Sequence, residues 1–275
     1  MRIDLGLVVG FVGGAIAKAG TTFTSFSNPD EVLVSSGFLG ALIAGFLGGF
    51  AVLFLKKLFN FMPKSLEGIR TILIYPVAGI LLIGIIMLLI NPFVAAINTG
   101  LNNFLFSLSG VNKIILGAIL AGMMSVDLGG PVNKAAYTFG TGMLAEGHYE
   151  IMAAVMIGGM VAPLAIAILA TFFPKKLPQK ERQAGLLNYV MGLSFISEGA
   201  IPFASADPIR VLPACIIGSA VSGAISMAFN CTLMAPHGGI FVLPLISNPV
   251  GFVVALLVGS AVAMAIMAML KKSVW

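Results

Sequence analysis

The sequence is short of charged residues, cysteine and histidine, and each shortage excludes a class of protein. Only 9% of its 275 residues are charged, 59% are hydrophobic, and the mean hydropathy is +1.08. Soluble domains carry about 25% charged residues, because a globule needs a solvated shell. Most of this chain's surface must therefore contact lipid.

Metal and redox sites are not indicated either. The two cysteines, Cys215 and Cys231, form no C-x-x-C pair, and the two histidines, His148 and His237, lie far apart in the sequence. Such residues give no ligand cluster of the usual spacing. The chain also lacks a P-loop, a G-x-S-x-G and an H-E-x-x-H. We expect no cofactor, no metal and no catalytic residue, and we expect that the chain is not an enzyme by itself.

The formal net charge of +5 does not indicate a nucleic-acid partner. The basic residues gather at the ends of apolar runs, in Lys56–Arg70, Lys175–Arg182 and the C-terminal pair Lys271 and Lys272. Cytoplasmic loops of membrane proteins have this distribution. We expect all three regions to face the cytoplasm.

Apolar runs of about 20 residues, the length that crosses a bilayer as a helix, recur along the chain. The clear candidates are Gly37–Leu55, Thr71–Ile90, Ile114–Val126, Ile151–Phe173, Ile209–Phe229 and Pro249–Leu270. Residues 5–17 form a weaker stretch. The pattern predicts an all-α fold: one membrane domain over residues 1–275, a bundle of about six to eight transmembrane helices.

The number of crossings between the first two basic loops must be even, yet three strong spans lie there. One more crossing is therefore expected, in Asn91–Ser109 or in Gly129–Leu144. Beyond Arg182, two spans already return the chain to the cytoplasm. Leu186–Asp207 must then enter and leave on one side, as a re-entrant hairpin, and the proline- and glycine-containing Ala235–Ser247 resembles a second one. Broken helices of this kind form substrate sites in transporters.

Two polar residues in these interrupted segments are candidate ligands of a polyol. The Glu198 carboxylate can accept hydrogen bonds from two hydroxyl groups; alternatively, it caps a half-helix or pairs with Arg210. The imidazole of His237 can donate and accept, and its glycine neighbours allow close approach; alternatively, it anchors a turn. Ionisable residues inside apolar sequence are costly and therefore functional candidates.

Four further polar residues are candidates for the walls of the site. Asp127 and Asn133 flank a Gly-Gly-Pro break and serve either substrate or scaffold, with Lys134 a possible partner of Asp127. Asp207 begins a helix as an N-cap, and Arg210 pairs with Asp207 or Glu198 or faces a phosphorylated sugar. His148, between two glutamates, is expected to face solvent.

Three ordered motifs resemble the membrane component IIC of fructose-type phosphotransferase permeases. They are Asp127–Ala136, Gly192–Val211 and Ala235–Val242, and Gly6–Gly14 adds to the likeness. The resemblance extends over essentially the whole chain. The family's membrane domain usually begins several helices earlier, so the resemblance implies a chain shortened at its N-terminus, without IIA or IIB domains.

The resemblance also implies a function, that of a multi-pass protein of the bacterial cytoplasmic membrane that binds a hexose and presents it to a separate phosphocysteine-bearing IIB/IIA partner. The family match favours fructose as the hexose. It implies sugar contacts for Glu198 and, more weakly, His237, and a homodimer. Two alternatives stay open: an ion-driven secondary carrier of sugars or metabolites, and an inactive fragment of a permease.

Overall fold

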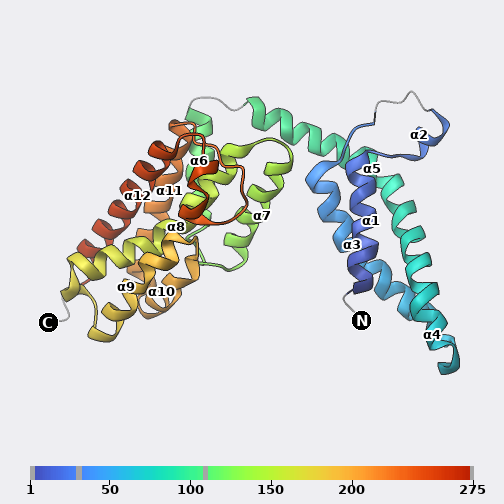
Figure 1. The fold of residues 1–275 in the computed structure, drawn as a ribbon, viewed down its shortest axis with the longest axis horizontal. Helices are drawn as coiled ribbons and strands as arrows, with labels where there is room; N and C mark the ends of the chain where they lie inside the picture. The colour runs from blue at the N-terminus through green and yellow to red at the C-terminus, as the bar shows by residue number, and fades with distance from the viewer. Residues whose placement is uncertain (1–3, 29–32, 108–110, 273–275) are drawn as a thin grey trace. The chain divides into compact units, whose positions relative to one another are not determined.

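The structure is a computed structural model that describes residues 4–28, 33–107 and 111–272 (Figure 1). Within these residues it contains helices and a single isolated β-bridge, between Leu233 and Ile246, but no β-strand. The expected all-α fold is confirmed. The chain divides into two compact units, residues 1–107 and 108–275, which are described in turn.

The first unit is built from three long helices, α1 (Asp4–Ala19), α3 (Gly37–Leu58) and α5 (Tyr75–Ser107). Short elements connect them: α2 (Phe23–Ser27), η1 (Phe59–Phe61), η2 (Lys64–Leu66), α4 (Glu67–Ile69) and η3 (Arg70–Ile74). Glycine lets α1 and α3 approach closely, since a Cβ atom on Gly48 would lie 2.7 Å from the backbone nitrogen of Gly10. Small residues at such contacts are typical of helices packed in lipid.

Helix α5 removes one of the two places where a hidden crossing was expected. It continues through Pro92 to Ser107 instead of ending near Ile90. Its 33 residues correspond to about 50 Å at 1.5 Å per residue, more than the bilayer core of about 30 Å. Asn91–Ser107 therefore extends the preceding helix and adds no crossing of its own.

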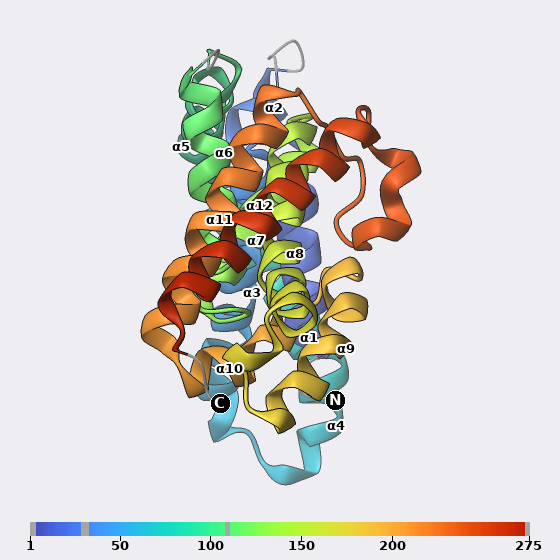
Figure 2. The same ribbon diagram turned by 90° about the vertical axis from the view of Figure 1, so that its left-hand side faces the viewer.

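The second unit contains seven α-helices in its described part. They are α6 (Val111–Met123), α7 (Pro131–Ala145), α8 (Tyr149–Phe172), α9 (Gln179–Leu193), α10 (Ile201–Ala206), α11 (Pro208–Ala228) and α12 (Pro249–Leu270). Three short turns, η4 (Pro174–Lys176), η5 (Ser197–Ala200) and η6 (Gly239–Leu245), lie between them. Helices α11 and α12 run side by side in Figures 1 and 2 and pack against each other.

Helix α8 is the core of this unit. In its most apolar stretch, 94% of the residues are buried, against 50% or less in the corresponding stretches of the other four long apolar helices. A helix that is apolar on every side is stable when other helices surround it, and α6, α7, α9, α11 and α12 all pack against α8. Every residue from Ile151 to Ala167 is buried. The depth at which a neighbouring helix ends can therefore be judged from the α8 residue that it contacts.

One end of this unit gathers basic residues. Lys176, after α8, donates a hydrogen bond of 2.6 Å to the carbonyl of Lys271, after α12. The ammonium of Lys271 lies 3.0 Å from the carboxylate of Asp207, which begins α11. The two basic segments that were expected to share a side of the membrane are thus in contact.

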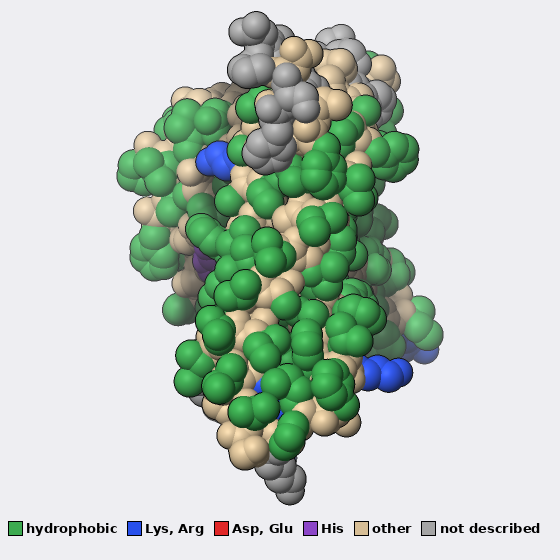
Figure 3. Space-filling view, turned by 90° about the vertical axis from the view of Figure 1, so that its right-hand side faces the viewer, with side chains coloured by type: hydrophobic (Ala, Val, Ile, Leu, Met, Phe, Trp, Pro, Cys, Tyr) green, Lys and Arg blue, Asp and Glu red, His purple; other side chains and the backbone are tan. Residues whose placement is uncertain are grey.

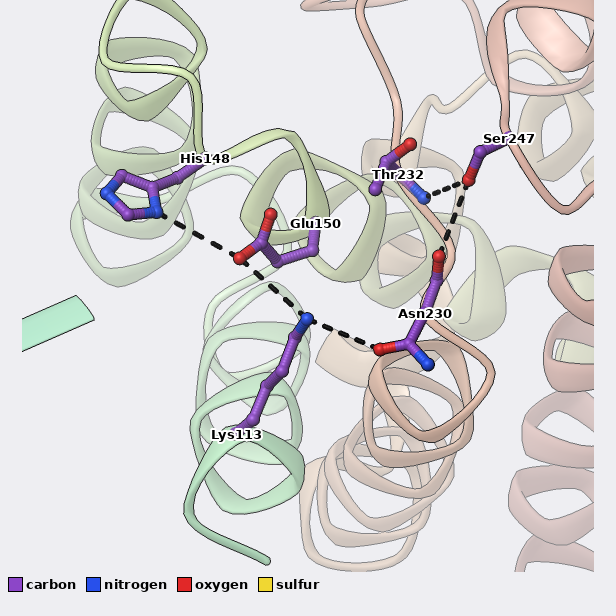
Figure 4. A network of polar contacts seen from close by, with 6 residues as sticks. All are labelled: Lys113, His148, Glu150, Asn230, Thr232 and Ser247. Carbon is purple, nitrogen blue, oxygen red and sulfur yellow. Dashed lines mark hydrogen bonds and ion pairs between the residues drawn. The ribbon is translucent and has the colours of Figure 1, made fainter. Parts of the chain in front are cut away.

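The opposite end is held by a polar network that joins the starts of α6 and α8 to the loop after α11 (Figure 4). Lys113 lies 3.9 Å from Glu150 and 3.5 Å from the side-chain oxygen of Asn230. Ser247 donates to the Asn230 carbonyl and accepts from the Thr232 backbone.

His148 belongs to this network, and the expectation that it faces solvent is wrong. Its side chain is 1% exposed, and Nδ1 lies 3.9 Å from a Glu150 oxygen. The connection between α7 and α8 is short, so the residue that starts α8 is enclosed by the packed helices.

The α6–α7 segment enters and leaves at that same polar end. Helix α6 starts beside α8, has 13 residues or about 20 Å, and stops beside the middle of α8, where a Cβ on Gly158 would lie 2.5 Å from the Cα of Ala121. Helix α7 then returns to the start of α8. The expected span Ile114–Val126 is therefore wrong: this apolar helix is buried against protein and ends at half depth. The crossings between the basic loops are then α5 and α8, an even number, and no hidden crossing is needed.

The predicted hairpin Leu186–Asp207 starts and ends at the basic end. Helix α9 runs antiparallel to α8, so that a Cβ on Gly192 would lie 2.6 Å from Leu164. After the break, α10 leads back to Asp207 beside Lys271. Ala235–Ser247, by contrast, forms a loop around η6 and not a pair of helices.

Five helices are long and apolar enough to cross a bilayer in the part of the chain that the structure describes. Two shorter apolar helices, Leu5–Ala19 and Val111–Met123, accompany them, and the whole is consistent with the expected polytopic bundle. Figure 3 shows one face of the molecule covered mainly by hydrophobic side chains, with few Lys or Arg. Exposed apolar residues include Ile72 on η3 and Leu81, Leu89 and Phe93 on α5. Such a surface is suited to lipid.

Candidate substrate site

Three interruptions of helical structure meet beside the middle of α8. They are the α6–α7 connection at residues 124–130, the α9–α10 connection at 194–200, and the loop that leads into η6. A Cβ on Gly159 of α8 would lie 2.4 Å from the ring of Phe195 and 3.1 Å from Met124. The backbone N–H of Gly239 donates to the sulfur of Met156, at 3.2 Å. Backbone without helical hydrogen bonds is stable at membrane depth where protein or an aqueous cavity surrounds it.

Asp127 fastens the start of α7. Its two carboxylate oxygens accept from the backbone N–H groups of Val132 (2.7 Å) and Asn133 (2.9 Å). A carboxylate in this position satisfies N–H groups that lack partners at a helix start and interacts favourably with the helix dipole. Asp127 therefore has backbone partners in place of the suggested Lys134. These contacts support the scaffold role, one of the two roles expected for this residue.

Asn133 connects two of the interruptions. Its side chain is 6% exposed, and its amide nitrogen donates to the carbonyl of Met124 at 2.6 Å and to the hydroxyl of Ser197 at 3.4 Å. The residue thus positions the turn that contains Glu198.

Glu198 lies on η5 with an exposed side chain. Its carboxylate covers Gly129, on which a Cβ would lie only 2.7 Å from Glu198 Oε1; Gly129 also has φ +111°, which favours glycine. Among the described residues, none forms a hydrogen bond or ion pair with this carboxylate. Glu198 is therefore available to a ligand.

An aromatic group includes Phe195, three residues before Glu198 on the same connection. The ring of His237 lies 5.1 Å from that of Phe195 and 6.5 Å from that of Tyr137, the latter edge-on at 79°. The His237 side chain is exposed. Tyr137 was not among the sequence candidates, although it follows Asn133 by four positions and so shares its helix face. Together these residues provide an acceptor, a donor–acceptor ring and an apolar surface.

Asp207 and Arg210 lie at the basic end and have partners there. Arg210 lies 3.2 Å from the Asp207 carboxylate. Of the two acidic partners suggested for Arg210, Asp207 and Glu198, it therefore pairs with Asp207. Burial opposes ionisation of the Asp207 carboxyl, but hydrogen bonds and charges from Lys271 and Arg210 outweigh this and lower the pKa of Asp207 below its usual value. Neither residue contacts the turn of Glu198.

No group of three or more His, Cys, Asp or Glu side chains that could hold a metal ion occurs within residues 4–28, 33–107 and 111–272. The chemistry available at the three interruptions is that of hydrogen bonding and stacking. It is suited to a neutral, hydroxyl-rich ligand.

Comparison with known proteins identifies the family. The family described as "Phosphotransferase system, EIIC" matches residues 6–218, which include two of the three motifs and most of the site. This chain belongs to the EIIC family. The membership confirms the resemblance drawn from the motifs, and with it a multi-pass membrane protein of the permease-component type. No solved structure matches the EIIC chain.

Three relatives show how this EIIC chain compares in length. The "Fructose permease IIC component" of Bacillus amyloliquefaciens is 46% identical over all of this chain and 90% of its own length. The "PTS system fructose-specific EIIC component" of Haloferax volcanii is 39% identical over 98% of this chain and 72% of its own. The "PTS system fructose-specific EIIABC component" of Bacillus subtilis is 45% identical over all of this chain, which spans only 44% of that protein.

Proposed function

We propose that this chain conducts fructose across the bacterial cytoplasmic membrane and presents it to a separate IIB partner for phosphorylation. The observation that supports this most directly is the unpaired Glu198 carboxylate, which covers Gly129 where the α6–α7 and α9–α10 connections touch. The α9–α10 connection also carries Phe195, whose ring lies 5.1 Å from that of His237. The names of the relatives supply the choice of sugar.

Sugar recognition follows from the chemistry of these side chains. The Glu198 carboxylate accepts hydrogen bonds from two neighbouring hydroxyl groups, and His237 donates to or accepts from a third. Phe195 and Tyr137 cover the carbon-bound hydrogens of the ring. A carboxylate gives strong hydrogen bonds without requiring a charged substrate.

Asp127 and Asn133 complete the wall by positioning the backbone around Glu198. Asp207 and Arg210 contribute from a distance, since they hold α10 and α11 to the end of α12.

The partner acts from the basic end of the second unit, which we assign to the cytoplasm by the distribution of lysine and arginine. A phosphoryl group bound to a cysteine sulfur of IIB passes to a hydroxyl oxygen of the sugar: the P–S bond breaks and a P–O bond forms. The EIIC chain forms no covalent intermediate in this step. The name of the Bacillus subtilis relative includes A and B parts with C, which supports a partner of this type.

The proposal also includes a homodimer within lipid. The exposed apolar faces of α3 and α5, with Phe46, Phe50 and Phe93 among their residues, provide surface for both lipid and a second copy.

Uptake of labelled fructose tests the function. Cells that lack their own fructose permease would express the chain with a IIB/IIA donor, or with a donor whose cysteine is replaced. Accumulation of fructose phosphate only with the intact donor supports the proposal. Free fructose inside the cells, independent of the donor, would instead identify a secondary carrier.

The role of Glu198 is tested in the same cells by Glu198→Gln. Loss of hydrogen bonds from two hydroxyls to a charged group should lower uptake by about 100-fold. Glu181→Gln changes another carboxylate, in the first turn of α9; it is the matched control and should transport normally. Equal uptake by the two variants would remove Glu198 from the site.

A further inference from the structure

The turn that contains Glu198 rests on a buried amide that has no hydrogen-bond partner. Asn188, on α9, is 1% exposed, and neither its nitrogen nor its oxygen forms a hydrogen bond with any described residue. A buried polar group without a partner costs about 1–3 kcal/mol. Leucine, of similar shape, would avoid that cost.

The position of Asn188 relates it to the site. Its oxygen fills the space in which a side chain of Gly199 would begin, since a Cβ there would lie 2.2 Å from Asn188 Oδ1. Gly199 directly follows Glu198. The first N–H groups of a short helix have no partner inside it. Glu198 is the second residue of η5, and no described residue outside η5 accepts from its backbone N–H. An unused acceptor and an unused donor are therefore adjacent.

The same segment is strained. Phe195 has φ +63°, in the left-handed region where a side chain other than glycine costs of the order of 1 kcal/mol or more. Within residues 188–199 the structure thus combines an unpaired buried amide, a strained aromatic residue and a free carboxylate. These features are expected of a segment with a second conformation in which the polar groups are paired.

We propose that Asn188 is a positioning residue for Glu198: when sugar engages the carboxylate, the Ser197–Ala200 turn shifts and the backbone N–H of Glu198 donates to Asn188 Oδ1. Binding of the sugar and formation of this hydrogen bond stabilise each other. The inference rests on the proposed function, because it requires a sugar at Glu198.

The test is fructose-dependent thermal stability of the purified full chain in detergent. Both cysteines, Cys215 and Cys231, are free and buried, so a thiol-reactive fluorophore reports unfolding. The rise of the melting temperature with fructose concentration gives an apparent Kd. The variants are Asn188→Leu and, as matched control, Ser260→Ala. The control removes a buried hydroxyl on α12 that, like the Asn188 amide, has no partner among the described residues.

The apparent Kd of Asn188→Leu for fructose should be about tenfold higher, because the variant cannot form the one hydrogen bond that accompanies binding. Its melting temperature without sugar should be equal to or above that of the wild type, because no bond is lost in that state. Ser260→Ala should bind fructose like the wild type. If Asn188→Leu does not accumulate as folded protein, Asn188→Ala replaces it and is judged by its apparent Kd.

Other results overturn the inference. An unchanged apparent Kd in Asn188→Leu, with the wild type still stabilised by fructose, removes the role of Asn188 and leaves the proposed function intact. A lower melting temperature without sugar, at unchanged affinity, would make Asn188 a purely structural residue. A wild type that fructose does not stabilise contradicts the proposed function itself, and the inference with it.

Discussion

Two of the three helix interruptions that meet beside α8 differ in how their polar groups are satisfied. In the α6–α7 connection, Asp127 accepts two backbone N–H groups and Asn133 donates to the Met124 carbonyl. In the α9–α10 connection, Glu198 and Asn188 have no hydrogen-bond partner among the described residues. Each connection contains one strained residue other than glycine, Leu128 or Phe195, so strain alone does not separate them.

The comparison suggests a division of labour. The first connection is a scaffold whose hydrogen bonds are complete without a ligand. The second has unused donors and acceptors, which a sugar and a small shift of the turn would satisfy. A site of this kind combines a fixed wall with an adjustable one, as expected of a protein that must both bind and release its substrate.

The largest effect after that of Glu198→Gln is expected where the two connections touch. Gly129→Ala would place a Cβ 2.7 Å from Glu198 Oε1 at a φ of +111°, with a cost of about 1–3 kcal/mol in backbone strain. Displacement of the carboxylate should lower fructose uptake by at least about tenfold. Gly147→Ala, at another positive φ but with open space around it, controls for strain. If it impairs uptake as strongly as Gly129→Ala, contact with Glu198 is not the cause.

Substitutions at Asp127 distinguish a structural role for this carboxylate from a role in binding the substrate. Asp127→Ala should lower the free energy of unfolding by about 0.5–2 kcal/mol. Asp127→Asn should lower it by less, because asparagine keeps one acceptor oxygen, although its NH2 group cannot accept from the second backbone N–H. Melting temperatures with the thiol-reactive probe, together with uptake, measure both. A stable Asp127→Asn protein that does not transport would show that the charge serves the substrate, and the contrast between the two connections would fail.

Tyr137, on α7, is expected to contact the sugar from the side of the site formed by the α6–α7 connection. Tyr137→Ala should lose about 0.5–1.5 kcal/mol of aromatic contact with Phe195 and His237, and with it about three- to tenfold in apparent affinity for fructose. Tyr137→Phe retains the ring and should retain the affinity. The concentration dependence of uptake measures both, and a large loss in Tyr137→Phe would indicate a direct role for the hydroxyl.

Asp207 is expected to give the smallest effect, and it depends on pH. The lowered pKa of this carboxyl means that it stabilises the fold above the unfolded-state pKa of about 3.9, and that this contribution disappears as pH falls through the folded-state value. Melting temperature measured from pH 7 to pH 3 should fall less steeply in Asp207→Asn than in the wild type. Parallel curves would contradict the assigned role of Lys271 and Arg210.

Sequence patterns predicted much of this molecule for identifiable reasons. The lipid-facing composition, the positions of five long helices and the hairpin at Leu186–Asp207 follow from hydropathy and from the count of crossings. Glu198 and His237 were found because charged and polar groups are costly in apolar surroundings. Tyr137 was missed, because an aromatic residue on an apolar helix resembles any other core residue.

Other features depended on contacts that no sequence pattern contains. Ile114–Val126 is as apolar as a span, and only its packing against α8 shows that α6 stops at half depth. His148 has the flanking charges of a loop residue, yet the packed helices enclose it. The unpaired state of Asn188 is likewise a property of its surroundings, since hydrogen bonds join residues that are distant in the chain.

By itself, then, the sequence determined that the chain is a helical membrane protein of the EIIC family with polar groups inside its apolar segments. The physical reason is that local composition decides whether a segment is stable in lipid. Only the tertiary structure decided which helices cross, which polar groups are satisfied and which remain available to a ligand. Those properties depend on the distances between segments, and packing around α8 brings the segments together.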